Sequence, residues 1–275
     1  MTPQRRHVLE TAGRATLATA LTGAAGYLVA PALAPLAAIA AAAGAIVLEL
    51  GQARAALGRQ LGELDAELAQ QAPLAELHRR LATRRALPAM RGFAIAPDCA
   101  LLLTELVADE QPELVVETGS GVSTLILAYG LERLGRGRVL ALDHDAAYAA
   151  ATRAELARHG LSAYATVVHA PLAAIELDGE RHRWYAPDAL AGLPPIDLVV
   201  DDGPPRYLGD RLRYASLPVL APRMSPRGIF VLDVIGPEER DNLARWRRRH
   251  PDFHHQLLDS RKGNAILRRT PAERA

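Results

Sequence analysis

The sequence predicts an α/β protein that is built on a doubly wound parallel sheet. Short runs rich in Val, Ile and Leu alternate with helical patterns in the second half of the chain, and the runs are apolar almost throughout. Such strands are typical of a parallel sheet covered by helices on both faces. Right-handed crossovers between successive strands then make the sheet doubly wound. The five expected strands are residues 113–117, 138–143, 164–170, 196–202 and 228–233.

The composition of the 275-residue chain limits the possible functions. Its formal net charge of +1 gives no general attraction to nucleic acid, and no nucleic-acid partner is expected. The single cysteine, Cys99, cannot form an internal disulfide, and no Cys/His cluster has the spacing of zinc ligands. These features favour a reducing compartment and a buried core thiol.

The first segment, residues 1–50, is apolar and is expected to be a helical membrane anchor. From Ala15 to Leu50 the only charged residue is Glu49. The stretch is therefore more apolar than a solvent-facing helix tolerates. Pro31 and Pro35 divide this stretch into halves of about 16 residues, near the lower limit for a membrane span. The pattern favours a helical hairpin, with one kinked span as the other possibility.

Basic residues on both sides of the apolar stretch predict its orientation. A hairpin with both ends in the cytoplasm satisfies the positive-inside rule and places the following domain there too. Two alternatives remain open: a cleaved secretory signal, and a soluble Ala-rich hairpin packed against another subunit. The flanking basic residues are Arg5, Arg6, Arg14, Arg54 and Arg59.

The second segment, residues 51–97, is expected to be an amphipathic helix and a linker. Four leucines at spacings of three and four residues form one helix face, which predicts packing on the chain's own domain or on a coiled-coil partner. They are Leu57, Leu61, Leu64 and Leu68. After the linker, Pro97 and Asp98 are typical of a helix start, and the α/β domain is predicted to span residues 98–269.

Each expected strand ends in a polar residue. In a doubly wound sheet, ligands bind outside the carboxyl ends of the strands. A single carboxylate there often caps the next helix, but acids at three or more strand ends on one edge indicate a site. These residues are Glu117, Asp143, His169, Asp201 with Asp202, and Asp233.

The turn after the first expected strand, "ETGSGVST" (residues 117–124), predicts the kind of ligand. Gly119 and Gly121 allow backbone N–H groups to approach a ligand closely. Thr124 replaces the third glycine of the dinucleotide fingerprint, and no P-loop lysine is near. Glu117 repels a pyrophosphate but attracts an ammonium group, so an adenosine that carries an amino acid fits best. Asp143 at the second strand end is placed to accept hydrogen bonds from ribose hydroxyls, with adenine near residues 169–171.

Four segments in order, "VVETGSGVSTLIL", "VLALDHD", "VVHAPL" and "IDLVVDDGPP", resemble the motifs of class I S-adenosylmethionine-dependent methyltransferases. The resemblance covers about residues 98–269. It implies a Rossmann-like seven-stranded sheet with an antiparallel seventh strand, for which "FHHQLLD" and "NAILRR" are candidates. It also implies S-adenosylmethionine as cofactor. The implied cofactor-binding residues are Glu117, Thr118, Gly119, Ser120, Gly121, Ser123, Thr124, Asp143, His144, His169 and Ala170.

The chain is most similar to the small-molecule O-methyltransferase branch. That resemblance implies a divalent cation held by an acid after the fourth strand and by an Asp-Asn pair after the fifth. Asp202 and Asp233 match the two acids, but Val234 occupies the asparagine position, so a metal is not favoured and no metal ligand is assigned. Without a metal, Asp202 or Asp233 is the candidate general base or acceptor-holding residue.

Two other groups of residues are given structural interpretations. Trp184 and Tyr185 in an expected hairpin are predicted to pack at its base, with lining of the acceptor pocket as the alternative. The sequence favours a solvated helix face for three arginines, with orientation of an anionic acceptor as the alternative: Arg206, Arg211 and Arg213.

The predicted function is methyl transfer to an oxygen of a small or lipid-like acceptor by a membrane-tethered enzyme. Residues 15–50 provide the membrane contact, and the acceptor and the oligomeric state stay open. The alternatives are an NAD-type oxidoreductase, and a non-catalytic membrane scaffold on the same fold.

Overall fold

The computed structural model describes residues 34–177, 179–233 and 235–270. It divides into two compact units, one up to Leu68 and one from Ala69 onward. The described part of the first unit is a single helix, α2 (Ala34–Leu68). Residues 1–33, which hold Pro31 and the first arm of the expected hairpin, lie outside the described residues.

Helix α2 joins the apolar segment and the amphipathic segment without a break at residue 50. Its four predicted face leucines are each more than half exposed, so their apolar face is not buried in the described chain. Among the described residues, one helical stretch, Pro35–Leu81, contains a window that is long and apolar enough to cross a membrane. That window is not buried.

The second unit is built on a seven-stranded sheet of order β3-β2-β1-β6-β7-β9-β8. Strands β3, β2, β1, β6 and β7 are mutually parallel, whereas β9 pairs antiparallel with both β7 and β8. This confirms the doubly wound sheet and the antiparallel strand predicted at the C-terminus. The strands are β1 (Leu114–Thr118), β2 (Arg138–Asp143), β3 (Ala165–His169), β6 (Ile196–Asp201), β7 (Met224–Leu232), β8 (Phe253–Leu258) and β9 (Asn264–Arg269).

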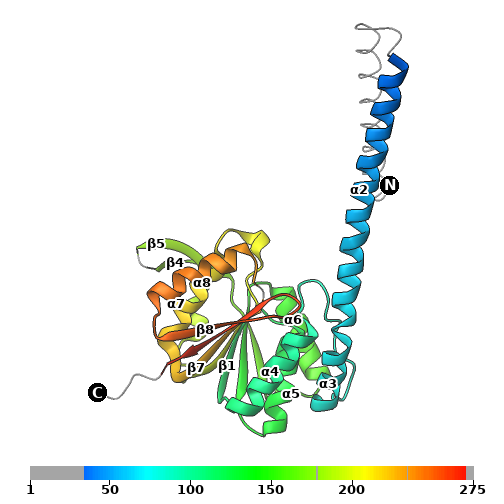
Figure 1. Cartoon of the computed structure of the whole chain (residues 1–275). Coiled ribbons are helices and arrows are strands. Elements are labelled where there is room, and N and C mark those ends of the chain that lie inside the picture. The colour runs from blue at the N-terminus through cyan, green and yellow to red at the C-terminus, as the bar shows by residue number, and fades with distance from the viewer. Residues whose placement is uncertain (1–33, 178, 234, 271–275) are drawn as a thin grey trace. The chain divides into compact units, whose positions relative to one another are not determined.

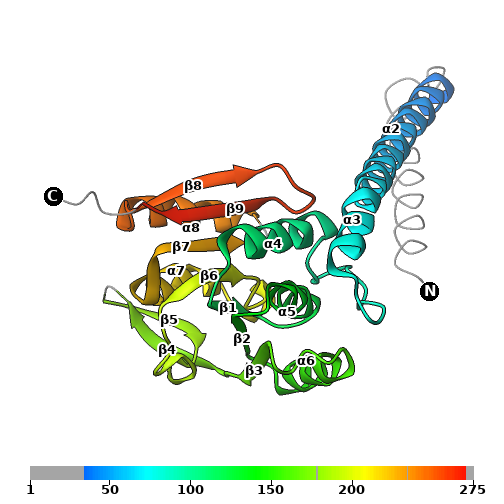
Figure 2. The same ribbon diagram turned by 90° about the horizontal axis from the view of Figure 1, so that it is seen from below.

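Helices cover both faces of this sheet (Figures 1 and 2). One apolar core includes Val115, Val200 and Val231 together with residues of α3, α4, α5 and α6. The other includes Val116 and Val199 together with residues of α7 and α8. Strands that bury alternate residues on opposite faces are apolar throughout, as the sequence predicts. These helices are α3 (Gln71–Leu81), α4 (Pro97–Glu110), α5 (Val122–Leu134), α6 (Ala146–Arg158), α7 (Ser216–Leu220) and α8 (Pro237–Arg249).

The segment before α4 belongs to the second unit. Leu77 and Leu81 of α3 are buried in its core. Beyond α3, Arg84 Nη1 donates to Glu132 Oε2 at 2.7 Å, and its Nη2 donates to the carbonyl of His159 at the same distance. The expected linker is therefore tied to α5 and α6 by hydrogen bonds as well as by apolar packing.

A two-stranded hairpin of β4 (Leu172–Leu177) and β5 (Glu180–Tyr185) forms a separate sheet (Figure 1), and it confirms the hairpin predicted from the sequence. Trp184 and Tyr185 are fully buried at its base, where Trp184 Nε1 donates to Ser216 Oγ at 3.1 Å. Packing was the predicted role for both. The described residues also contain four short 3₁₀ helices: η2 (Pro187–Leu190), η3 (Arg206–Leu208), η4 (Leu212–Ala215) and η5 (Ala221–Arg223).

Candidate functional site

The register of the parallel strands brings the predicted polar residues to one edge of the sheet. Thr118 pairs with Leu142 and with Asp201, and Asp143 pairs with His169. Because parallel strands share a direction, their last residues lie side by side at the carboxyl edge. The candidate site is therefore a row of strand ends, with β1 between β2 and β6.

The turn between β1 and α5 is shaped by two glycines with positive φ. At Gly119 φ is +90°, and a Cβ atom there would lie 3.3 Å from the carbonyl oxygen of Asp202. At Gly121 φ is +153°, and a Cβ atom would meet nothing within 4 Å. The first glycine lets the turn pass close to the end of β6, while the second faces open space. Backbone at Gly121 is thus accessible to a ligand.

Glu117 is fully buried beneath this turn. The Gly121 N–H donates to Thr124 Oγ1 at 3.0 Å, and that hydroxyl donates to Glu117 Oε2 at 2.5 Å. Glu117 Oε1 has no hydrogen-bond partner in the described part of the chain. Burial raises the pKa of Glu117 to about 7, against the opposing effect of the Ser123 and Thr124 hydroxyls. An orphaned carboxylate oxygen in this position attracts a cationic group.

Asp143 at the end of β2 is held by its neighbours. Ser120 Oγ donates to Asp143 Oδ2 at 2.5 Å, and the backbone N–H of Asp145 donates to Oδ1 at 2.9 Å. His144 Nδ1 lies 3.7 Å from Oδ1. A carboxylate has about four lone-pair positions, so acceptor capacity remains for a ligand.

The residues predicted near adenine flank Asp143. His169 is exposed at the end of β3, and the N–H of buried Ala170 donates to the Asp143 carbonyl at 2.7 Å. Thr118 is also predicted to bind the cofactor, but its side chain points toward the end of β6. Its hydroxyl contacts Asp201 Oδ1 at 2.7 Å and the Gly203 carbonyl at 3.1 Å. Burial raises the pKa of Asp201 to about 6.

Asp202 and Asp233 follow the last paired residues of β6 and β7 and therefore lie side by side. Asp233 is fully buried, and neither of its carboxylate oxygens has a hydrogen-bond partner in the described ranges. Burial, reinforced by the charge of Asp233, raises the pKa of Asp202 well above its usual range. A carboxylate with a raised pKa is a stronger base, which suits the predicted role of Asp202.

Two cations flank this carboxylate pair. Arg213 Nη2 lies 3.7 Å from Asp202 Oδ1, and Lys262 Nζ lies 3.9 Å from Asp233 Oδ2. The sequence interpretation of Arg213 as part of a solvated helix face is wrong, because its side chain is buried, with only 9% exposed. Arg206 and Arg211 are about half exposed, as expected. Lys262 was missed entirely, since it lies in a turn far along the chain from both acids.

The residues at this pair do not fit a divalent cation. Hard cations take six or more oxygen ligands, and the third position implied by the resemblance holds a valine. The described residues contain no group of three or more His, Cys, Asp or Glu side chains with metal-binding geometry. In addition, an ammonium group already lies beside Asp233.

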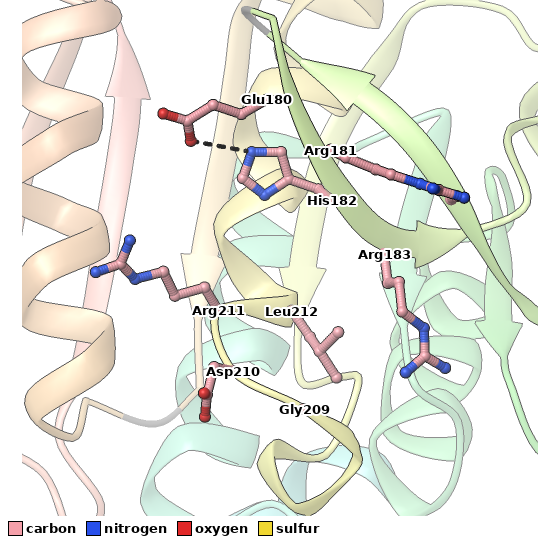
Figure 3. A pocket seen from close by; sticks show the side chains of 9 residues that line it. Glu180, Arg181, His182, Arg183, Gly209, Asp210, Arg211 and Leu212 are labelled. Atoms are coloured by element: carbon pink, nitrogen blue, oxygen red, sulfur yellow. Dashed lines mark ion pairs between the residues drawn. The ribbon is translucent and has the colours of Figure 1, made fainter.

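A cavity of about 680 Å³ lies between β5 and residues 209–212. Glu180 and His182 point to one side of β5, with 3.7 Å between them, while Arg181 and Arg183 point to the other (Figure 3). None of the strand-end carboxylates lines this cavity. It is therefore separate from the row of strand ends, and its charges are mixed in sign.

Comparisons with known proteins agree with this geometry. Residues 116–235 match a family model described as a methyltransferase domain. No curated protein sequence matches the chain. The match to the methyltransferase family model disfavours the NAD-type oxidoreductase alternative.

Two solved structures show the same fold. One is the SAH-bound methyltransferase PaMTH1 of Podospora anserina, with 16% identity, a TM-score of 0.53, and coverage of 77% of this chain and 95% of that one. The other is a precorrin-6y C5,15-methyltransferase of Geobacter metallireducens, with 14% identity, a TM-score of 0.50, and coverage of 66% and 92%.

The substitution Glu117→Gln is expected to stabilise the ligand-free protein increasingly as pH rises. The raised pKa means that folding favours the protonated carboxyl, so the wild type loses stability between about pH 4.5 and pH 7. The difference between variant and wild type should grow by up to about 3 kcal/mol between pH 5 and pH 8. Urea unfolding at several pH values measures it.

The exposed residue Glu113, which directly precedes β1, provides the matched control, Glu113→Gln. This control removes an exposed carboxylate and should not reproduce the growing stabilisation expected for Glu117→Gln. A pH-independent difference for Glu117→Gln as well would contradict the raised pKa.

Proposed function

We propose that this protein is a membrane-tethered methyltransferase that transfers a methyl group from S-adenosylmethionine to an oxygen of a small or lipid-like acceptor. The match of residues 116–235 to a methyltransferase domain and the fold shared with solved methyltransferases support the proposal. The observation that carries the proposal is Glu117. Its buried carboxyl has one oxygen without a hydrogen-bond partner among the described residues, and it lies beneath a glycine turn that is open at Gly121. That arrangement suits a cationic amino acid group and disfavours a pyrophosphate.

Different residues of the chain would bind the methionine part, the ribose and the adenine of the cofactor. Glu117 Oε1 accepts from the ammonium of the methionine part, while the backbone at Gly119 and Gly121 lies along it. Asp143 accepts hydrogen bonds from the ribose hydroxyls. Its carboxylate oxygens have lone-pair positions that Ser120 and Asp145 do not use. His169 and Ala170, next to Asp143 in the sheet, flank the adenine.

The reaction requires a proton acceptor and alignment. Bound S-adenosylmethionine supplies an electrophilic methyl carbon on a sulfonium. Asp202 takes the proton of the acceptor hydroxyl as the oxygen attacks, because its carboxylate lies at the end of β6 beside Asp233 and burial raises its pKa. In-line placement of the oxygen supplies much of the rate, so the strand ends act mainly by holding both reactants.

The membrane part of the proposal is based on the N-terminal segment. Residues 15–50 are nearly free of charge, and α2 continues that segment as an uninterrupted helix into charged sequence. A helix of this kind leaving a membrane keeps the methyltransferase domain near the lipid surface. Acceptors that partition into lipid are then concentrated at the enzyme.

Binding of S-adenosylhomocysteine is expected to release protons at pH 6.5, because the ligand's ammonium stabilises ionised Glu117. The heat measured by isothermal titration should therefore vary with the ionisation enthalpy of the buffer. Glu117→Gln should abolish that dependence and weaken binding about 10- to 100-fold, the range of one charged hydrogen bond. Asp143→Asn should weaken binding without removing the buffer dependence. Glu113→Gln should match the wild type, and unchanged binding in the Glu117 and Asp143 variants would refute the cofactor assignment.

The full chain is expected to fractionate with membranes and to need detergent for extraction. The fragment 69–275 should remain soluble and unfold cooperatively, because both apolar cores lie within it. Centrifugation and thermal unfolding measure the two properties. A full chain that stays soluble without detergent would contradict the tether.

An extract supplied with S-adenosylmethionine labelled at the methyl carbon should yield a labelled small or lipid-soluble product when the purified chain is added. Asp202→Asn should reduce labelling about 10²-fold or more while S-adenosylhomocysteine still binds. Normal ligand binding with no labelled product in any extract would favour the non-catalytic scaffold.

A further inference from the structure

The turn between β8 and β9 delivers Lys262 to the pair of carboxylates at the ends of β6 and β7. Its Nζ lies 3.9 Å from Asp233 Oδ2 and donates to the Ala94 carbonyl at 2.6 Å. Its side chain is only 22% exposed. The backbone helps to fix the turn, because the Ile235 N–H donates to the Lys262 carbonyl at 3.3 Å. The ammonium is therefore held in place from the end of β7 and from the segment before α4.

The ammonium has donor capacity to spare. It carries three N–H groups, and one of them is used by Ala94. Asp233 has two buried oxygens without hydrogen-bond partners in the described residues. A buried carboxylate in that condition is costly unless a positive charge is close. Lys262 supplies that charge to Asp233, as Arg213 does to Asp202.

The ammonium and a divalent cation compete for the same carboxylate oxygen. Two like charges held against one carboxylate oxygen repel each other, and a divalent ion repels the ammonium more strongly than a monovalent ion does. A metal at Asp233 would therefore have to displace Lys262, and valine leaves it without a third protein ligand at the expected position.

We propose that Lys262 is the resident cation of the Asp202–Asp233 pair and that its ammonium contacts the acceptor oxygen during methyl transfer. This inference rests on the proposed function. The acceptor oxygen uses a lone pair to bond the methyl carbon, the electron pair of the broken C–S bond stays on sulfur, and the hydroxyl proton passes to Asp202. The Lys262 ammonium keeps its own protons and stabilises the negative charge that develops on the oxygen.

A metal titration tests the proposal without an acceptor. Full-length protein in detergent, saturated with S-adenosylhomocysteine, is titrated with Mn²⁺ and followed by electron paramagnetic resonance. Wild type should show no binding at millimolar Mn²⁺, whereas Lys262→Met should gain affinity at least tenfold. Arg261→Met, which removes an exposed charge one residue away, should behave as wild type. Tight Mn²⁺ binding by wild type, or no gain in Lys262→Met, would overturn the proposal.

Transfer of labelled methyl groups in the acceptor-containing extract gives the second measurement. Wild type should be insensitive to EDTA and to added Mg²⁺. Lys262→Met should lose about 10²-fold in rate, and Lys262→Arg should retain more of it. S-adenosylhomocysteine affinity should be unchanged in both variants. Both should unfold cooperatively, with Lys262→Met less stable than Lys262→Arg because buried Asp233 loses its counter-charge. An undiminished rate in Lys262→Met would refute the role of Lys262, whereas failure of wild type to bind S-adenosylhomocysteine would refute the methyltransferase function instead.

Discussion

Burial of carboxylates at one edge of a parallel sheet is the constraint on which the rest of this structure depends. Glu117, Asp201 and Asp233 are fully buried, and each has at least one oxygen without a partner in the described residues. Such groups are costly unless positive charge or hydrogen-bond donors approach. The hydroxyl of Thr124, the guanidinium of Arg213 and the ammonium of Lys262 each meet part of this demand. The remaining demand biases the edge toward cationic ligands.

The pleat of the sheet separates these acids by face. Val115, Val200 and Val231 face the core under α4 and α5, so Glu117, Asp202 and Asp233, each two residues further on, continue that face. Thr118 and Asp201 continue the opposite face and bond each other. Reactive groups therefore gather on the side of α4 and α5, while the Thr118–Asp201 contact joins β1 to β6 beneath them.

Local signals in the sequence predicted the strands, the glycine turn and the strand-end acids, because each depends on residues close together in the chain. Arg213 and Lys262 could not be predicted in this way. Their partners lie 11 and 29 residues away, and nothing in the flanking sequence distinguishes them from exposed basic residues. The boundary predicted at residue 50 lies where apolar sequence gives way to charged sequence. Alanine and leucine favour helix on either side of it, so α2 continues through that boundary without a break.

The antiparallel direction of β9 is what brings Lys262 to the site. Leu232 at the end of β7 pairs with Ala265 near the start of β9, so the residues that precede β9 arrive at the carboxyl edge. Asn264 Nδ2 also donates to the Asp233 carbonyl, so the turn before β9 is hydrogen-bonded to the residue whose carboxylate Lys262 contacts. A parallel strand in this position would bring its own last residues to that edge and send the preceding turn to the opposite one. The reversed strand thus couples the position of a cation to the position of its carboxylate.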